Sequence, residues 1–447
     1  MGNGEAEASC SRINSISSTG GMNMRILIIG GGGREHAIAW SLAKSAKVEK
    51  LYCAPGNAGI AEVAECVPIA VDKFAELADF AKEAAVDLVF VGPDDPLAAG
   101  IVDVFEAAGI PAFGPDKKAA EIEGSKIFMK NLLRKYNIPT ARYECFTDFE
   151  QALAYLRQQP LPVVVKADGL AAGKGVTVAS TLEEAEEALR GMMLGGVFGA
   201  SGSQVVIEEF MTGQEMSILA FVDGETVRAM VPAQDHKPVF DGDLGPNTGG
   251  MGTYSPLPHV DPALVEEALR TIIEPTARAM VSEGRPFRGV LFAGLMLTPE
   301  GVKTVEFNAR MGDPETQVVL PRLQTDLLDI VLAAMDGTLD QIEISWSDEA
   351  AVCVIAASEG YPGTYPKGRA ISGLEEAKAA GALVFHAGTA LQDGETVTSG
   401  GRVLGIVGRG RDIAEARSRA YEAAAAVSFE GMQLRSDIAM KALQAGK

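Results

Sequence analysis

An alternation of short apolar runs with helical segments, beginning at Met24, constrains the fold of this chain more than any other feature. The expected order is strand 25–29, helix 34–46, strand 50–53, helix 73–85 and strand 88–91. Continuous apolar strands between helices indicate a parallel sheet that is buried on both faces. We therefore expect an α/β protein whose first domain, 24–123, contains a parallel sheet.

Each of these three strands runs into a loop punctuated by Gly or Pro, at 30–33, 54–59 and 92–96. Ligands of doubly wound sheets bind outside the carboxyl ends of the strands, so these loops are expected to line a site. The first loop could hold a phosphate or ribose phosphate on its N–H groups, or could be a structural tight turn. It does not fit a dinucleotide motif, because Glu35 or His36 stands where the third glycine belongs.

The rest of the chain divides into two further units and a leader. The second unit, 124–345, is expected to contain a mobile lid subdomain at about 125–196. The last unit, 346–447, alternates as an antiparallel sheet does and has a hairpin turn at 393–394, so we expect a C-terminal α+β domain. Residues 1–23 are polar and rich in Ser, Gly and Asn, which predicts a flexible leader. Expected strands of the second unit are 163–165, 176–178, 205–207, 216–222, 289–297 and 303–306.

Charge and cysteine usage exclude several classes of protein. Lys and Arg total 39 against 60 acidic residues, and the net charge of -21 would repel a nucleic acid. The five cysteines are scattered and never spaced C-x-x-C, which argues against a disulfide framework or zinc knuckle and favours a reducing compartment. No apolar stretch approaches the roughly 18 residues that span a bilayer. We expect a cytoplasmic protein with no nucleic-acid or membrane partner.

A glycine-rich turn at 166–175 joins two apolar strands and carries lysines. Its N–H groups could fold over a triphosphate while Lys166 reaches in from the strand. It is not a Walker loop, because Gly175 follows Lys174 where Ser or Thr is required. Downstream, the connector after strand 205–207 could present backbone groups to a purine edge, and Glu215 could accept both ribose hydroxyls.

A third segment places Glu306, Asn308 and Arg310 on one face of a strand by simple alternation. A carboxylate and a carboxamide oxygen two residues apart suit Mg²⁺, which keeps substrate phosphates in its shell. Arg310 beside them can take charge on a transferring phosphoryl group. Glu306 alone would more often be a solvated strand residue, and Lys166 alone a surface lysine. The three segments in this order favour ATP chemistry.

Four polar residues in Gly- and Pro-rich loops, Asp235, Asn247, Asp313 and Glu315, could bind small polar substrates or could simply stabilise turns.

Several longer runs follow one another in a distinctive order. They are 31–37 (GGGREHA), 55–59 (PGNAG), 91–93 (VGP), 166–175 (KADGLAAGKG), 234–237 (QDHK), 245–252 (GPNTGGMG), 306–308 (EFN) and 310–317 (RMGDPETQ). In this order they resemble the ATP-grasp carboxylate–amine ligases, and more narrowly the phosphoribosylamine–glycine ligase family. The similarity extends from Met24 essentially to the end of the chain.

The resemblance implies a two-part ATP-grasp domain with a mobile lid, and it implies the reaction. Glycine and 5-phosphoribosylamine would be joined by means of ATP and Mg²⁺ or Mn²⁺, through a glycyl phosphate, as the second step of de novo purine synthesis. The partners would be these small molecules, and the chain would be a monomer or weak homodimer. Alternatives are another ATP-grasp ligase with a different acid or amine, a redox enzyme using the glycine run, and a nucleotide-binding regulatory protein without turnover.

The resemblance also implies roles for individual residues. ATP would be bound by Lys126, Lys166, Gly169, Gly173, Lys174, Gly175, Glu208, Glu209, Phe210 and Glu215. The other substrates would be bound by Gly32, Gly33, Arg34, Glu35, Gly56, Asn57, Asp235, Asn247, Thr248, Gly249, Gly250, Arg310, Asp313 and Glu315. Glu306 and Asn308 would hold the metal, and Arg310 and Lys166 would be catalytic. Many relatives have a further metal-binding acid where this chain reads Phe-Ala-Gly-Leu at 292–295, so two protein ligands per metal are expected.

Overall fold

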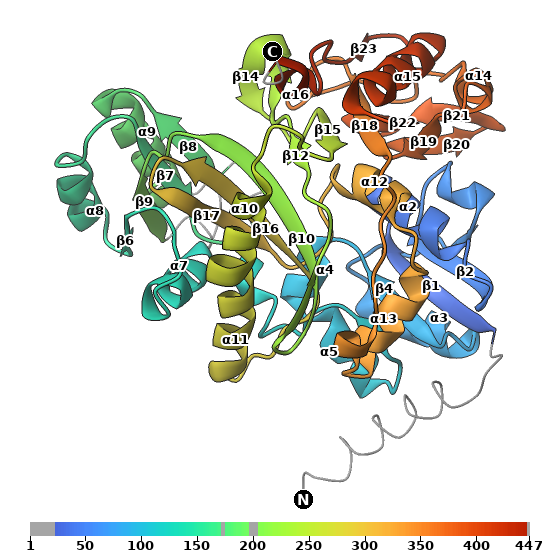
Figure 1. Ribbon diagram of the computed structural model, residues 1–447, viewed down its shortest axis with the longest axis horizontal. Helices are drawn as coiled ribbons and strands as arrows, with labels where there is room; N and C mark the ends of the chain where they lie inside the picture. Colours follow the sequence, from blue (N-terminus) through green and yellow to red (C-terminus); the bar gives the residue numbers. More distant parts are fainter. Residues whose placement is uncertain (1–22, 171–174, 196–203, 445–447) are drawn as a thin grey trace, which may run out of the picture.

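The computed structural model describes residues 23–170, 175–195 and 204–444 (Figure 1). The expected leader up to residue 22 and residues 171–174 of the glycine-rich turn, which include the expected site residues Gly173 and Lys174, lie outside the described residues. In Figure 1 the N-terminal domain (blue) lies below the C-terminal domain (orange and red), and the two sheets of the middle unit extend to the left.

The N-terminal domain contains the expected parallel sheet, with five strands in the order β3-β2-β1-β4-β5. The first expected helix ends four residues early. Beyond its end the Ser45 hydroxyl donates to Asp326, which is distant in the sequence, and accepts from the Lys47 amide, so side-chain hydrogen bonds hold this segment in a non-helical conformation. The elements are β1 (Met24–Gly30), α2 (Gly33–Leu42), β2 (Val48–Pro55), β3 (Glu65–Cys66), α3 (Phe74–Glu83), β4 (Leu88–Val91), α4 (Asp94–Ala99), α5 (Ile101–Ala107) and β5 (Ala112–Phe113).

The middle unit is built on two four-stranded sheets whose paired strands are antiparallel. The first has the order β6-β9-β7-β8 and the second β11-β10-β16-β17. The first sheet and its helices are α6 (Glu121–Gly124), α7 (Lys126–Lys135), β6 (Tyr143–Phe146), α8 (Phe149–Leu156), β7 (Val163–Ala167), β8 (Val176–Ala179), α9 (Leu182–Met193) and β9 (Val205–Glu209). The second sheet and its helices are β10 (Gln214–Asp223), β11 (Thr226–Ala229), α10 (Pro262–Ala268), α11 (Glu274–Ser282), β16 (Arg288–Thr298), β17 (Gly301–Asn308), α12 (Thr316–Val319) and α13 (Leu327–Met335).

The C-terminal domain is α+β, as expected. Its sheet has the order β12-β15-β18-β22-β19, with β23 added beside β18, and α15 packs on β18 and β22. The expected hairpin turn joins β20 to β21, and both Asp393 and Gly394 have positive φ (53° and 85°), as a two-residue turn requires. The elements are β12 (Gln234–Asp235), β13 (Pro238–Phe240), β14 (Leu244–Asn247), β15 (Gly252–Ser255), β18 (Ala350–Ser358), α14 (Leu374–Ala379), β19 (Leu383–His386), β20 (Thr389–Gln392), β21 (Glu395–Thr398), β22 (Arg402–Gly410), α15 (Ile413–Ala426), β23 (Met432–Gln433) and α16 (Met440–Gln444).

Two of the sheets contain strands from both sides of an expected domain boundary. The exact boundaries therefore stay predictions. β9 begins after residue 196 but lies in the same sheet as β7. β12 and β15 precede residue 346 but extend the C-terminal sheet, since β15 pairs with β18. Residues 234–255 therefore connect the middle unit to the C-terminal domain.

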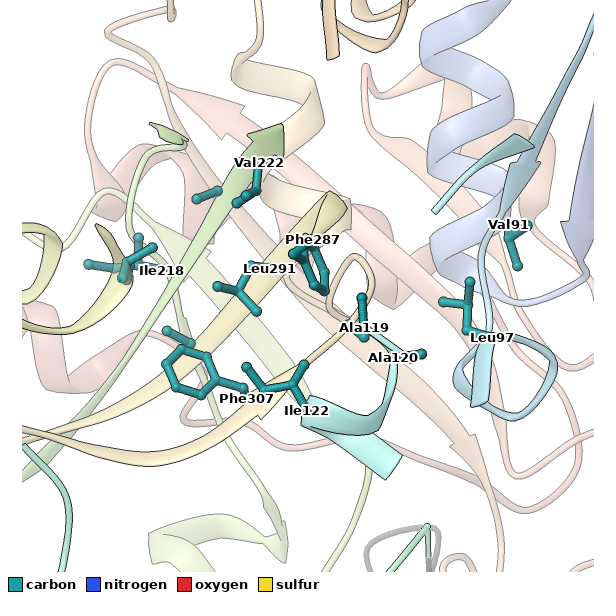
Figure 2. Packing of buried hydrophobic residues seen from close by; sticks show 14 of the residues in the cluster. Val91, Leu97, Ala119, Ala120, Ile122, Ile218, Val222, Phe287, Leu291 and Phe307 are labelled. Atoms are coloured by element: carbon teal, nitrogen blue, oxygen red, sulfur yellow. The ribbon is translucent and has the colours of Figure 1, made fainter. Parts of the chain in front are cut away.

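One buried hydrophobic cluster runs from the N-terminal domain into the middle unit (Figure 2). Val91 and Leu97 of the first domain are followed in this cluster by Ile122 of the connecting segment, and then by Leu291 and Phe307 of the second sheet. All five side chains are at most 3% exposed. The parallel sheet and the second antiparallel sheet thus share one core, so their loops hold a defined relative position.

Within the described ranges, no helix has both the length and the apolar character needed to cross a membrane.

Candidate active site

The two antiparallel sheets meet where β7 and β9 approach β17. The Lys166 ammonium, at the end of β7, lies 3.5 Å from the carbonyl oxygen of Val305 on β17. Close by, Thr140 pairs with Thr304 in an isolated bridge. A small pocket beside this junction is lined by Glu215, Met216, Ser217, Lys237, Gly294, Leu295 and Val305.

Lys166 is buried and ion-paired with Glu208 of β9, whose other carboxylate oxygen lies 2.5 Å from the Lys130 ammonium. Burial by itself raises the pKa of Glu208, but the two lysines more than offset it and the pKa is lowered. Glu208 is among the residues expected to bind ATP, and its carboxylate is engaged with these two lysines.

Lys126 is brought to the glycine-rich turn by the start of α7. Its ammonium donates to the carbonyl of Gly169 at 2.8 Å, and Asp168 accepts from the Ile127 amide at 3.0 Å. At the far end of the turn the Gly175 carbonyl accepts from the Ala167 amide at 2.8 Å. Burial lowers the pKa of Lys126 although carboxylates nearby, Glu306 foremost, oppose this.

Three further residues that are expected to bind ATP have different environments. The Glu209 carboxylate accepts from Arg142 Nε at 2.6 Å and from the Arg142 amide at 3.0 Å, so its charge is already paired. Phe210 is 41% exposed and offers an open apolar face. Glu215 is half exposed and lies 3.6 Å from Lys237. The ring and the Glu215 carboxylate therefore stand where solvent or a ligand can reach them.

Glu306 and Asn308 stand at the end of β17, opposite Gly294 and Phe292 of β16. A Cβ at Gly294 would lie 3.3 Å from Glu306 Cγ, so the glycine leaves room for that side chain. Burial raises the pKa of Glu306, but Lys237, Lys166, Lys126 and Arg310 together outweigh it and the pKa is lowered. An ionised carboxylate beside a carboxamide fits a hard divalent cation.

The protein offers few side-chain ligands for a metal ion near Glu306 and Asn308. In the part of the chain that the structure describes, no three His, Cys, Asp or Glu side chains are grouped to hold a metal ion. A cation bound by Glu306 and Asn308 therefore needs further ligands from a substrate, as Mg²⁺ takes from phosphates.

Lys237 is a site residue that the sequence reasoning missed. Its ammonium lies 3.9 Å from Glu306 and 3.6 Å from Glu215, and these carboxylates raise its pKa, Glu215 most strongly. Lys237 is part of the run 234–237 that carries the family resemblance, and this was the feature of the sequence that could have identified it as a site residue.

Arg310 lies between the second sheet and the N-terminal domain. Its guanidinium is 3.0 Å from Glu123 and 3.7 Å from Asp94, and Glu123 also accepts from the Ala309 amide at 2.7 Å. Burial lowers the pKa of Arg310, but nearby carboxylates, Glu123 and then Asp94 foremost, outweigh this and raise it. The arginine is thus permanently charged and held in place, and Glu123 and Asp94 are further residues that the sequence did not reveal.

Asp235 and Glu315 are both buried near Lys237. Burial raises the pKa of Asp235 to about 6, with Glu215 and Glu306 adding to the effect. Burial, followed by the charge of Asp235, raises the pKa of Glu315 to about 7, and its carboxylate accepts from Ser217 Oγ at 3.3 Å. Burial therefore favours the protonated form of both carboxyl groups.

Asp313 is fixed by Arg402 of the C-terminal sheet. The guanidinium lies 3.0 Å from the Asp313 carboxylate and also donates to the carbonyls of Gly249 (2.6 Å) and Gly250 (3.4 Å). Arg402 thereby joins two expected substrate loops. It is separated from them by 89 to 153 residues, so no local pattern could have predicted it.

The loop that contains Thr248 is closed by its own hydrogen bonds. Thr248 Oγ1 donates to the Lys237 carbonyl at 2.7 Å and accepts from the Gly250 amide at 2.9 Å. Gly250 has φ of 112°, and a Cβ there would press on Pro314. Asn247 is exposed at the end of β14.

The glycine run before α2 is already occupied by a carboxylate. Glu35 accepts from the Gly32 amide at 2.7 Å and from Arg34 Nε at 2.5 Å, and it packs where a Cβ at Gly30 would clash. A Cβ at Gly33 would press on Gln317. The negative charge of Glu35 disfavours a phosphate at the Gly32 amide, which supports the tight-turn alternative there.

Asn57 and Gly56 tie the second loop to its surroundings. The Asn57 amide donates to the carbonyls of Gly31 (2.8 Å) and His386 (2.7 Å), and its oxygen accepts from the Ile60 amide at 2.9 Å. The Gly56 amide donates to the Gly30 carbonyl. Asn57 thus joins the N-terminal and C-terminal domains, and its hydrogen bonds are used within the protein.

Comparison with known families matches three domain models in chain order. They describe the phosphoribosylglycinamide synthetase N domain (24–123), ATP-grasp (A) domain (124–316) and C domain (351–441). The second match identifies the unit with the two antiparallel sheets, the lysines and Glu306 as the ATP-grasp domain of an enzyme.

Comparison with individual proteins identifies the family within this class of enzymes. The chain is 53% identical over 416 residues to a phosphoribosylamine–glycine ligase of Caldanaerobacter subterraneus subsp. tengcongensis, covering 93% of this chain and 99% of that protein. It is 52% identical over 420 residues to one of Halalkalibacterium halodurans, covering 94% and 97%. The chain belongs to the phosphoribosylglycinamide synthetase family.

Solved structures agree with this. The crystal structure of the phosphoribosylamine–glycine ligase of Thermotoga maritima superposes with a TM-score of 0.82 at 35% identity, covering 93% of this chain and all of that one. A biotin carboxylase domain from Hydrogenobacter thermophilus, solved with MgADP, superposes with a TM-score of 0.72 at 15% identity, covering 95% and 94%. The second similarity shows the fold alone.

Proposed function

We propose that this chain is an ATP-dependent carbon–nitrogen ligase that joins glycine to 5-phosphoribosylamine, giving glycinamide ribonucleotide, ADP and phosphate in de novo purine biosynthesis. The observation that carries the proposal is the grouping of four cationic side chains around Glu306: Lys237 lies 3.9 Å from its carboxylate, and the charges of Lys126, Lys166 and Arg310 also lower its pKa. Four cations around one ionised carboxylate suit a triphosphate and its metal. Family membership supplies the identity of the acid and the amine.

A carboxylate is a poor electrophile, so the chemistry needs two steps. The glycine carboxylate attacks the γ-phosphorus, the bond to the bridging oxygen breaks, and ADP leaves. The amine of 5-phosphoribosylamine then attacks the carbonyl carbon of the acyl phosphate. The carbon–oxygen bond breaks, and inorganic phosphate leaves with one of the original carboxylate oxygens.

The cationic side chains serve the first step. Lys126 and Lys166 orient the phosphates, while Lys237 and Arg310 stabilise the charge on the group in transfer. Mg²⁺ or Mn²⁺ would be held by Glu306 and Asn308, and when bound it supplies positive charge to the phosphate oxygens. The turn residues Gly169, Gly173, Lys174 and Gly175 would bind the triphosphate, and a site that excludes water would protect an acyl phosphate from hydrolysis.

The remaining assignments are also proposals. Backbone groups at Glu209 and Phe210 would meet the purine, and Glu215 the ribose. Asp235, Asp313 and Glu315 would bind the two polar substrates. We propose further that the enzyme acts in the cytoplasm as a monomer or weak homodimer.

The direct test is ADP release with glycine and freshly generated 5-phosphoribosylamine. Release that requires both compounds supports the proposal. Equal release with alanine, aspartate or bicarbonate in place of glycine would favour another carboxylate–amine ligase.

A further inference from the structure

Lys130, in the middle of α7, is fully buried, which is costly for a lysine. Its ammonium lies 2.5 Å from Glu208 Oε2 and donates to Thr140 Oγ1 at 2.8 Å. The ring of Tyr143 lies 5.4 Å from it. A buried charge with this many dedicated partners indicates a role beyond packing.

Glu208 is shared between two cations. One carboxylate oxygen pairs with Lys130 and the other with Lys166. The three side chains together carry one net positive charge. Without Lys130 the remaining pair would be neutral, and Lys166 would be the one cation among the described residues that still pairs with Glu208. Lys166 would then be held more tightly and would present less charge to a phosphate.

The same lysine also connects the two sheets. Thr140, which accepts from Lys130, donates to the Thr304 carbonyl at 2.9 Å, and the Thr304 amide donates to the Pro139 carbonyl at 2.9 Å. Thr304 stands on β17 two residues before Glu306. A chain of polar contacts therefore runs from Glu208 through Lys130 and Thr140 to β17, the strand that carries Glu306.

We propose that Lys130 is a positioning residue for ATP: acting through Glu208, it keeps Lys166 available to the phosphates and aligned with Glu306. Lys130 need not touch the nucleotide. The inference rests on the proposed function, because it assumes that Lys166 binds phosphate.

The first test is Lys130→Met, which removes the charge and keeps an unbranched side chain. The Kd for ATP, measured by calorimetry, and the KM for ATP are expected to rise about tenfold, because the site loses one unit of charge next to the phosphates. The KM for glycine should stay within about twofold. The matched control is Lys135→Met on the same helix, whose side chain is 63% exposed and pairs with Glu283 at the surface, and which should change neither value.

Neutralising both partners separates positioning from packing. In Lys130→Met/Glu208→Gln, Lys166 is released from the carboxylate and the net positive charge returns. ATP affinity should therefore recover to within about threefold of Glu208→Gln alone. Losses that simply add in the double variant would show that Lys130 only supports the fold.

An unchanged Kd for ATP in Lys130→Met would overturn the inference. If that variant does not fold, Lys130→Gln removes the same charge and keeps a donor for Thr140 Oγ1, and an unchanged KM for ATP in this variant would be equally decisive against the inference. Failure of the unaltered enzyme to release ADP with glycine and 5-phosphoribosylamine would instead refute the proposed function.

Discussion

Replacing Arg402 by methionine should destabilise the protein and weaken binding of the two polar substrates, because this side chain ties the C-terminal sheet to two loops of the site. The guanidinium pairs with the Asp313 carboxylate at 3.0 Å and donates to the carbonyls of Gly249 (2.6 Å) and Asp313 (2.9 Å). Methionine keeps much of the aliphatic stem and removes all of these contacts.

The size of the effect follows from what remains around Asp313. Its carboxylate would keep one hydrogen bond, from Gln317 Nε2 at 2.7 Å, but would lose its ion-pair partner. Removing one partner of a buried ion pair costs about 3–5 kcal/mol. Both side chains are 18% exposed, so water recovers part of this. We expect a loss of about 3 kcal/mol in the free energy of unfolding.

Urea unfolding followed by circular dichroism measures this loss, and Arg411→Met is the control. Arg411 is 84% exposed and its contacts with Asp412 and Glu415 are 3.6 Å long, so its loss should be under about 0.5 kcal/mol. In Arg402→Met the KM values for glycine and 5-phosphoribosylamine should rise more than the KM for ATP. A destabilisation below about 1 kcal/mol with unchanged KM values would refute the reasoning.

Three further predictions concern the metal, the catalytic arginine and pH. Glu306→Ala should reduce metal-dependent ATP turnover far more than Asn308→Asp, which keeps an oxygen ligand; parent activity of Glu306→Ala across a Mg²⁺ titration would exclude the metal assignment. Arg310→Ala should slow phosphoryl transfer in a single turnover more than it weakens ATP binding, and equal effects on both would contradict a role in the transition state. Burial lowers the pKa of His36 to about 3 and of His386 to about 4. Between these values and pH 6.5 the two rings are protonated in the unfolded chain but neutral in the folded protein. The free energy of unfolding should therefore fall as the pH is lowered from 6.5 towards 4. In His386→Gln, urea unfolding across this range should show a dependence of the free energy of unfolding on pH that is weaker by up to about 1.4 kcal/mol per pH unit. An unchanged dependence would contradict a contribution from His386.

Local pattern was enough to predict the elements that carry the site. Continuous apolar runs predicted β1 and β4, and alternation along β17 placed Glu306 and Asn308 on one face. These features depend on neighbours in the sequence. The same holds for the hairpin turn at Asp393, where the backbone conformation is set by the two residues themselves.

Contacts between distant segments could not be predicted in this way. Arg402 reaches Asp313 across 89 residues, and nothing around either residue indicates the partner. Lys130 lies in an amphipathic helix where a lysine is ordinarily solvated, yet it is fully buried against Glu208. The glycine run was consistent with either an anion site or a tight turn, and Glu35 accepts from the Gly32 amide, a detail that only the folded turn reveals.

The acyl phosphate is the central claim, and isotope transfer from glycine tests it most directly. With ¹⁸O in the glycine carboxyl group, one labelled oxygen should appear in inorganic phosphate per turnover, because that oxygen joins the γ-phosphorus before the amine displaces it. Mass spectrometry of the released phosphate measures this. Unlabelled phosphate, with all the heavy oxygen retained in the amide product or in free glycine, would contradict the account.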